Sequence, residues 1–358
     1  LADGYDLVLD LEKSRGRRLY DVRHKRWFLD FFSFFASCPV GLNHPALHDK
    51  AFEKKLLTAA RHKPSNPEIF TREIAEFVAT FGRVAIPKVL PHLFLVEGGG
   101  LAVENALKAA FDWKVRKNLA AGRGEKGSRI LHFREAFHGR TGYTLSLTNT
   151  ADPRKIQYFP KFDWPRVTNP KMRFPLTKEN LALTIRDEQK TVREIEAAFR
   201  KHRHDIAAIL VEPIQSEGGD NHFRAEFLKT LRKLADRHET LLIFDEVQTG
   251  VGLTGKMWCY QHFGVTPDIL CFGKKMQVCG ILAGRRLDEV KENVFRVKSR
   301  INSTWGGNLG DMVRATRFLE IIERERLVEN AARVGRHLLG RLESLAEEFP
   351  FAVANPRG

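Results

Sequence analysis

Two segments of the chain place an ionisable side chain directly after an apolar run. Residues 241–244 are followed by Asp245, and residues 269–272 are followed by Gly273 and Lys274. Burial lowers the pKa of an amine, which makes it available to form a Schiff base with a carbonyl carbon. A buried carboxylate needs a partner, such as a protonated ring nitrogen. The pair therefore predicts chemistry on an aromatic heterocycle that carries an aldehyde.

Residues beside this pair could complete a binding site for such a ring. Val247 would share a face with Asp245 and could pack on the ring, and Gln248 could donate a hydrogen bond to a phenolic oxygen. Lys275 competes with Lys274 as the reactive amine. Without the neighbouring carboxylate, the two lysines would be better explained as a surface pair at the end of a strand.

A run of glycines offers a place for a phosphate group. Gly98, Gly99 and Gly100 follow an expected strand over 92–96 and open a helical stretch over 102–117. Glycine lets the backbone approach an anion closely, and the N–H groups at a helix start attract one. The run lacks the sequence of a P-loop and the spacing of a dinucleotide turn, so it favours a single phosphate over a nucleotide. With the acid and the amine, it indicates pyridoxal 5′-phosphate (PLP).

Three further loops carry candidate residues for the same site. Phe137 follows an expected strand over 129–133 and could stack on a planar cofactor, although taken alone it is better explained as a core residue. Arg140 could bind a carboxylate with two hydrogen bonds. The acids within residues 212–219 could equally be loop surface, and Thr304 offers a hydroxyl to a phosphate.

Apolar strands alternate with helical stretches along much of the chain, which predicts an α/β fold with a mostly parallel, helix-covered sheet. In such sheets the loops at the carboxyl ends of the strands meet at one edge, where ligands bind. The expected strands cover 92–96, 129–133, 207–211, 241–244, 269–272 and 281–283, and the expected helices between them cover 102–117 and 225–238.

The outer parts of the chain have different patterns. Residues 1–35 predict a small meander, and helical apolar spacing covers 45–82 and 311–348. We therefore expect three parts. These are an N-terminal segment over 1–75, a large PLP-binding domain over 76–315 and the start of a smaller second domain over 316–358.

The composition narrows the class of protein. The net charge of +15 could suggest nucleic acid, but acids alternate with the basic residues and no basic tract carries aromatics, so a solvated basic surface explains it better. No apolar run approaches the ~18 residues of a membrane span. The 4 cysteines form no CxxC pair and the 13 histidines show no zinc spacing. These features predict no metal site and a reduced, cytoplasmic location.

Taken together, these segments resemble class III PLP-dependent aminotransferases of fold type I, and the resemblance spans nearly the whole chain. Several segments are similar to a lysine-specific branch of that class, namely 97–117, 136–150, 161–166, 272–286 and 301–308. The resemblance implies ping-pong transfer of the ε-amino group of L-lysine to 2-oxoglutarate, giving 2-aminoadipate 6-semialdehyde and L-glutamate. It also implies a homodimer with a shared active site.

The resemblance assigns roles to individual residues. Arg140 and Asn302 match positions that contact substrate. Glu217 matches a glutamate that alternately pairs with a distant arginine and releases it, so that one site accepts both an ω-amine and the α-carboxylate of glutamate. The implied cofactor contacts are Lys274 to the aldehyde, Asp245 to the pyridine nitrogen, Phe137 to the ring face, Gln248 to the phenolic oxygen, and Gly99, Gly100 and the partner subunit's Thr304 to the phosphate.

Two departures from the family pattern leave alternatives open. Many class III enzymes have a hydroxyl residue in the phosphate turn, where this chain has only Gly98, Gly99 and Gly100. The family's switch arginine would lie beyond Gly358, and the chain has no initiator Met, so we expect a trimmed chain with part of the small domain missing. The alternative donors are ornithine, acetylornithine and 4-aminobutyrate, and the non-enzymatic alternatives are a truncated paralogue without activity and a nucleic-acid-binding protein.

Overall fold

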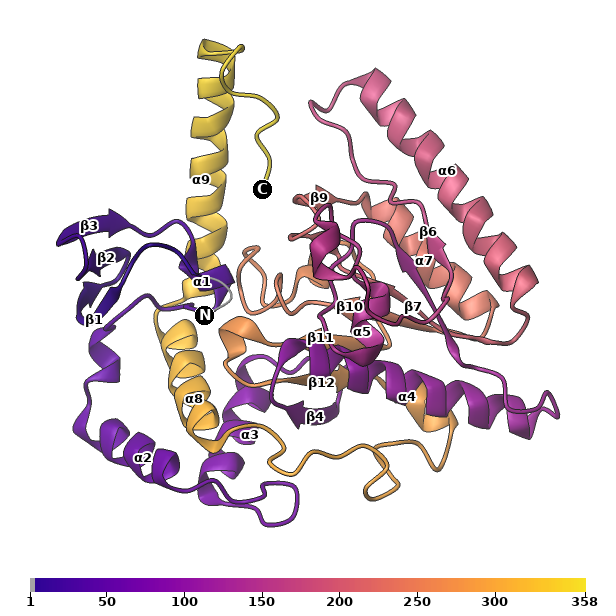
Figure 1. The fold of residues 1–358 in the computed structure, drawn as a ribbon, viewed down its shortest axis with the longest axis horizontal. Coiled ribbons are helices and arrows are strands. Elements are labelled where there is room, and N and C mark those ends of the chain that lie inside the picture. The colour runs from indigo at the N-terminus through magenta and orange to yellow at the C-terminus, as the bar shows by residue number, and fades with distance from the viewer. Residues whose placement is uncertain (1–3) are drawn as a thin grey trace.

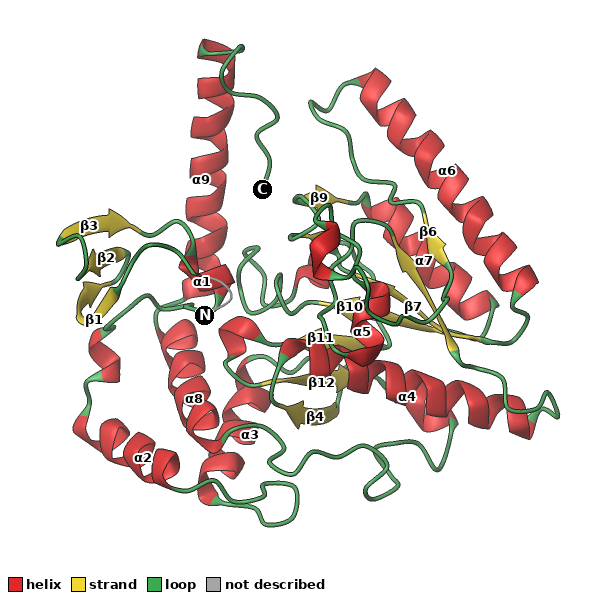
Figure 2. Cartoon of the chain, viewed as in Figure 1, coloured by secondary structure: helices red, strands yellow, loops and turns green. Residues whose placement is uncertain are grey.

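A seven-stranded sheet forms the centre of the computed structural model, which describes residues 4–358 (Figures 1 and 2). β12 runs antiparallel to both of its neighbours, and the other neighbouring strands are parallel. This confirms the predicted α/β fold with a mostly parallel sheet. The strand order is β4 (His92–Val96), β12 (Cys279–Ala283), β11 (Ile269–Phe272), β10 (Leu241–Asp245), β7 (Ile206–Val211), β5 (Arg129–Phe133) and β6 (Arg166–Val167).

Alternate residues of the central strands enter two separate cores, because successive side chains of a strand point to opposite faces. Ile209 and Leu242 pack into the core that includes α3 (Arg72–Val84), α7 (Ala225–Arg237) and α8 (Leu309–Arg324). Leu210 and Ile243 pack into the other core, against α4 (Gly99–Ala120). Burial on both faces explains why these strands are continuous apolar runs in the sequence.

Several elements were not predicted, and the longest of them is α6 (Lys178–Lys201). Its buried face carries Thr184, Glu188 and Thr191 before the apolar Ile195. These positions have helical spacing, but their polar residues hide the apolar periodicity on which the prediction depends. The other unpredicted α-helices and strands are short: α1 (Ser33–Ala36), α5 (Gly142–Leu147), β6, β8 (Ile214–Gln215) and β9 (Asn221–His222).

The N-terminal part forms the predicted meander, an antiparallel sheet of β1 (Leu9–Arg15), β2 (Arg18–Asp21) and β3 (Arg26–Leu29). Residues 1–3 of this predicted segment lie outside the described residues. The helical stretch predicted over 45–82 corresponds to α2 (Lys50–Arg61) and α3, which ends two residues later, and that over 311–348 corresponds to α8, which begins two residues earlier, and α9 (Leu327–Glu348). α9 extends outward from the end of α8 (Figure 1) and buries none of its residues. The limits of the three expected parts stay a prediction.

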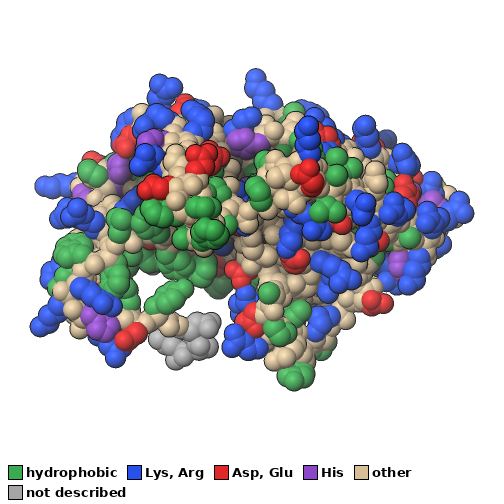
Figure 3. All heavy atoms as spheres, turned by 90° about the horizontal axis from the view of Figure 1, so that it is seen from above, with side chains coloured by type: hydrophobic (Ala, Val, Ile, Leu, Met, Phe, Trp, Pro, Cys, Tyr) green, Lys and Arg blue, Asp and Glu red, His purple; other side chains and the backbone are tan. Residues whose placement is uncertain are grey.

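The surface fits the predicted solvated basic character. Lys and Arg side chains are spread over the face seen in Figure 3 and alternate with acids. None of the helices in residues 4–358 is both long enough and apolar enough to cross a membrane.

Candidate active site

The carboxyl edge of the sheet brings the predicted loops together. β10 and β11 are parallel neighbours, with Asp245 paired in register with Cys271, so Asp245 and Lys274 follow the same edge. The loops after β4, β5 and β7 reach this edge too, because these strands run in the same direction. They carry the glycine run, Phe137 and Glu212. The geometric part of the sequence prediction therefore agrees with the fold, while the roles of the individual residues stay predictions.

The two lysines after β11 lie in different environments. Lys274 is half-buried, and its Nζ donates to Oε1 of Gln248. Lys275 is buried, and its Nζ donates to the backbone oxygen of Gln248 at 2.5 Å. Burial lowers the pKa of Lys274, while Asp245 and other nearby acids oppose this change. Lys274 therefore has the accessible amine that the predicted chemistry requires.

His138 holds the carboxylate of Asp245, a contact that the sequence interpretation missed. Its Nδ1 lies 2.8 Å from Oδ2 of Asp245, and both side chains are buried. The other oxygen of Asp245 accepts the N–H of Val247 at 3.1 Å. The carboxylate is therefore fixed in orientation. The signal in the sequence was only that His138 follows Phe137, because the two partners are 107 positions apart in the chain.

Glu212 is a second buried acid at this edge, whereas the sequence left it as a candidate for loop surface. Its Oε1 accepts the N–H of Phe137 at 2.9 Å. Burial, with the nearby charge of Asp245, raises the pKa of Glu212 well above its ordinary value of 4.5. The loop that carries Phe137 is therefore attached to the end of β7 by a buried acid.

Glycine is required at two positions where the start of α4 packs closely, Gly99 and Gly139. A Cβ atom on Gly99 would lie 2.9 Å from Cγ1 of Val247, and one on Gly139 would lie 2.8 Å from Cα of Gly100. Gly98 has φ +103°, a left-handed conformation that side chains disfavour. The first N–H groups of α4 have no acceptor within the helix. The turn therefore combines close backbone packing with free donors, which suits a phosphate.

Charged groups surround the ring of half-buried Phe137. The Arg140 guanidinium carbon and the Lys155 Nζ each lie 6.0 Å from the ring centroid. Lys155 forms an ion pair with Glu217, and Arg140 is exposed. The sequence interpretation named Arg140 and Glu217 but missed Lys155, which ends a short 3-10 helix (Pro153–Lys155) after α5. This side of the site therefore offers cations to a carboxylate-bearing ligand.

Thr304 and Asn302 are exposed, and within residues 4–358 no hydrogen bond or ion pair joins either side chain to another predicted site residue. The loop that carries them is held by Asn66, whose Nδ2 donates to the backbone oxygens of Trp305 at 2.8 Å and Gly307 at 3.0 Å. The loop is thus positioned by its own subunit while Thr304 stays exposed.

A left-handed segment lies beside Lys274 and was not predicted. The four residues of α1 (Ser33–Ala36) have φ between 49° and 59°. The Phe35 ring centroid lies 5.6 Å from Nζ of Lys274, and Nε2 of Gln277 donates to the backbone oxygen of Ser37 at 2.8 Å. Such conformations are costly for residues other than glycine and occur where a binding site holds them.

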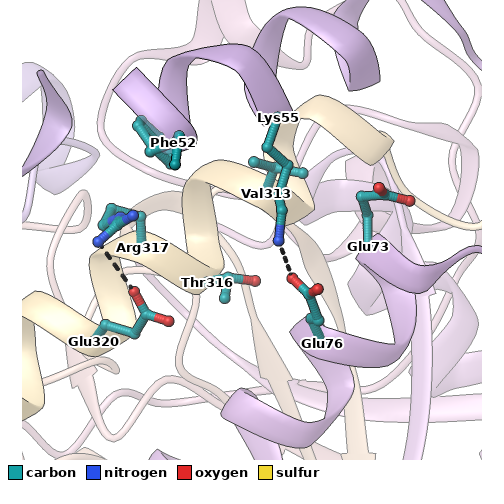
Figure 4. Close-up of a pocket in the computed structure, with 9 residues that line it drawn as sticks. Phe52, Lys55, Glu73, Glu76, Val313, Thr316, Arg317 and Glu320 are labelled. Carbon is teal, nitrogen blue, oxygen red and sulfur yellow. Dashed lines mark hydrogen bonds and ion pairs between the residues drawn. The ribbon is translucent and has the colours of Figure 1, made fainter. Parts of the chain in front are cut away.

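A pocket between α2, α3 and α8 shares no residue with this edge (Figure 4). Four of its five charged side chains form two ion pairs, Lys55 with Glu76 and Arg317 with Glu320, and the fifth is Glu73. Because both cations are already paired, we assign it no chemistry.

The profile of the family described as Aminotransferase class-III matches residues 2–357. The chain belongs to the class III aminotransferase family. These enzymes use PLP, and the fold is the fold type I of PLP-dependent transferases. The sheet edge fits this cofactor, because it combines a glycine turn that a side chain would block, an aromatic ring, a fixed carboxylate and a half-buried amine.

The names of proteins that are similar to this chain agree with the family assignment. The chain is 56% identical to the "L-lysine-epsilon aminotransferase" of Mycobacterium tuberculosis, across 100% of this chain and 79% of the relative. It is 49% identical to the protein of the same name from Streptomyces clavuligerus, of which it covers 78%, and 33% identical to human mitochondrial 4-aminobutyrate aminotransferase, of which it covers 74%. The solved "Lysine aminotransferase from M. tuberculosis in the internal aldimine form" has a TM-score of 0.97 at 55% identity, over 100% of this chain and 82% of that one.

Proposed function

We propose that this aminotransferase moves the ε-amino group of L-lysine to 2-oxoglutarate by a ping-pong mechanism, giving 2-aminoadipate 6-semialdehyde and L-glutamate. The observation that carries the choice of donor is the difference in identity between two kinds of relative. Whole-chain identity is 56% to a protein named for lysine and 33% to one named for 4-aminobutyrate.

Bound PLP supplies an aldehyde that bonds to amines and a pyridine ring that withdraws electrons. In our proposal Asp245, oriented by His138, holds the ring nitrogen protonated, and Phe137 and Val247 cover the ring. Gln248 contacts the phenolic oxygen. Gly99 and Gly100 present the N–H groups of the α4 start to the phosphate.

Lys274 is the residue that we propose to bond to the cofactor and to move protons. Its amine is half-buried, and burial lowers its pKa, which favours the neutral, nucleophilic form. Once a substrate amine has displaced it, the free Nζ of Lys274 can take a proton from one carbon and return it to another.

For the substrate, we propose that Arg140 binds the carboxylate distant from the reacting group, with Asn302 nearby. An exposed guanidinium beside Phe137 supports this role. Glu217 is the group that we propose to discriminate between an amine and a carboxylate. Lys155 neutralises Glu217 in this structure, so the acid already has one exchangeable cationic partner.

We further propose a cytoplasmic homodimer in which the partner subunit's Thr304 completes the phosphate site. The outward-facing loop around Thr304, held in place by Asn66, supports this arrangement. Substitution of Thr304 by Val should then weaken PLP binding without changing the size of the assembly in light scattering.

Amino-donor profiling tests the function. With 2-oxoglutarate as acceptor, kcat/KM should be highest for L-lysine among L-lysine, L-ornithine, N-acetylornithine and 4-aminobutyrate. Labelled nitrogen placed at the ε position of lysine should appear in glutamate, and label at the α position should not. A higher kcat/KM for another donor would assign the enzyme to that donor, and a protein that binds no PLP would support a paralogue without activity.

A further inference from the structure

Two consecutive lysines hold the same residue through different atoms. Nζ of Lys274 donates to the side-chain oxygen of Gln248, and Nζ of Lys275 donates to the backbone oxygen of Gln248. Lys274 is half-buried, whereas Lys275 is 4% exposed. The side chain of Gln248 therefore belongs to the site, while its backbone is held by a buried amine that the proposed chemistry does not use.

The buried amine of Lys275 has no acid as a direct partner. The nearby Glu246 uses both of its carboxylate oxygens on backbone N–H groups, those of Cys259 at 2.6 Å and Tyr260 at 2.8 Å. In residues 4–358, no carboxylate lies within ion-pair distance of Lys275. Burial, aided by the charge of Lys274 and opposed by that of Glu246, lowers the pKa of Lys275 to about 7. A buried amine is costly unless it is hydrogen-bonded. The hydrogen bond to Gln248 therefore offsets the cost of burying Lys275.

The turn that contains Gln248 is fixed at both ends by other contacts. The N–H of Val247 donates to Oδ1 of Asp245 at 3.1 Å, and that of Gly250 donates to the backbone oxygen of Glu246 at 2.9 Å. Within the described chain, no backbone N–H donates to the backbone oxygen of Gln248. Lys275 is therefore the contact that fixes the middle of the turn.

We propose that Lys275 is a positioning residue, whose buried amine fixes the Gln248 backbone so that the Gln248 side chain stays against the amine of Lys274. This inference rests on the proposed role of Lys274. It adds a function for the second lysine of the pair, which would otherwise be explained as a fold-stabilising charge. Loss of Lys275 should let the Gln248 side chain leave Lys274, and so change the protonation of the lysine bonded to PLP.

The test compares Lys275→Met, Gln248→Ala and the double variant as holoenzymes. The first readout is the pH midpoint of the visible absorbance of bound PLP, which follows protonation at Lys274. We expect each single variant to move this midpoint by ~1 unit and to lower kcat by ~10-fold, with KM for L-lysine little changed. The double variant should move it no further than either single variant, because both act through one contact. Additive shifts, or no shift with Lys275→Met, would overturn the proposal.

Two controls separate this proposal from its alternatives. If Lys275 only balances the charge of Glu246, the pair Lys275→Met/Glu246→Gln should regain the wild-type midpoint, which would also overturn the proposal. If Lys275→Met does not fold, Lys275→Gln replaces it, because this variant keeps a hydrogen-bond donor on a shorter side chain. It should shift the pH midpoint in the same direction by a smaller amount. An unchanged midpoint in this variant counts against the proposal. Retained turnover in Lys274→Ala would refute the proposed function itself, whatever Lys275 does.

Discussion

The acidic side chains at the two edges of the central sheet have different partners and opposite pKa shifts. At the amino edge, Asp205 accepts the N–H of Gly127 at 2.8 Å and pairs with Arg129 at 2.9 Å, and Glu239 pairs with Arg123 at 2.6 Å. These contacts lower the pKa of both acids. At the carboxyl edge, Glu212 and Glu246 are buried with backbone donors, and in residues 4–358 no cation lies at ion-pair distance from either; burial raises their pKa.

This difference separates charges that support the fold from charges that support chemistry. A carboxylate whose pKa is lowered by folding stabilises the folded state near neutral pH, and one whose pKa is raised destabilises it there. The acids of the amino edge therefore stabilise the folded protein near neutral pH. The acids of the carboxyl edge destabilise it there, and they place protonatable groups beside Lys274. Perturbed groups of this kind cluster at functional sites. Substitutions matched across the two edges can break or sharpen this comparison.

The largest difference should appear between two lysines. Lys274→Ala should lower turnover by more than ~10³-fold and abolish the visible absorbance of lysine-bound PLP, because it removes the amine that bonds to the cofactor and moves protons. Lys114, at the amino edge, is also buried, and donates to the backbone oxygen of Glu239 at 2.5 Å. Lys114→Met should lower the free energy of unfolding by about 1–3 kcal/mol and leave kcat unchanged. Equal loss of turnover in both variants would remove the distinction between the edges.

Two aspartates give the next largest contrast. Asp245→Asn keeps the shape of the side chain but removes its charge, and should lower kcat by ~10²-fold with little change in Tm. Asp205→Asn should do the reverse, with unchanged kcat and a lower Tm, because Asp205 accepts several hydrogen bonds as an anion. Steady-state kinetics and thermal unfolding of the same preparations measure both effects. A stability loss confined to Asp245→Asn would contradict the assignment.

Glu246 should produce a pH-dependent effect on stability. Burial raises its pKa from 4.5 to about 8 in the folded protein, so its contribution to stability is complete below 4.5 and is lost as pH rises through about 8. Glu246→Gln cannot lose a proton. The Tm of this variant should therefore rise relative to that of the wild-type protein as pH increases from 5 to 9. Parallel Tm curves across that range would show that Glu246 ionises in the folded protein as it does in the unfolded chain.

The smallest effect, opposite in sign, belongs to Glu239. Its lowered pKa means that it stabilises the fold above its ordinary value of 4.5, and that this contribution disappears as pH falls through its folded pKa. Glu239→Gln should lower stability at pH 7 by a few tenths of a kcal/mol, since its ion pairs are substantially exposed. The difference from wild type should vanish in acid. Chemical denaturation at two pH values measures it, and a difference that grows in acid would count against the ion pairs.

The apolar strands could be predicted from the sequence because they are buried on both faces. β4, β5 and β11 begin and end at the predicted residues, whereas α6 escaped prediction because Thr and Glu occupy part of its buried face. The positions of Asp245 and Lys274 followed from strand ends alone.

The remaining site residues depend on contacts that no local pattern encodes. His138 meets Asp245, Lys155 meets Glu217, and Phe35 approaches Lys274 only after distant loops have folded together. The sequence therefore carries no signal for these contacts beyond the place of His138 after Phe137.

Val247 links the phosphate turn to the loop that carries Lys274. A Cβ atom at Gly99 would lie 2.9 Å from its Cγ1, and one at Gly273 would lie 3.4 Å from the same atom. A larger residue at Gly99 fits only if position 247 becomes smaller at the same time, whereas one at Gly273 first meets Sγ of Cys279 at 2.8 Å. In evolution positions 99 and 247 are therefore expected to vary jointly, so that a change in the phosphate turn is accompanied by a compensating change after β10.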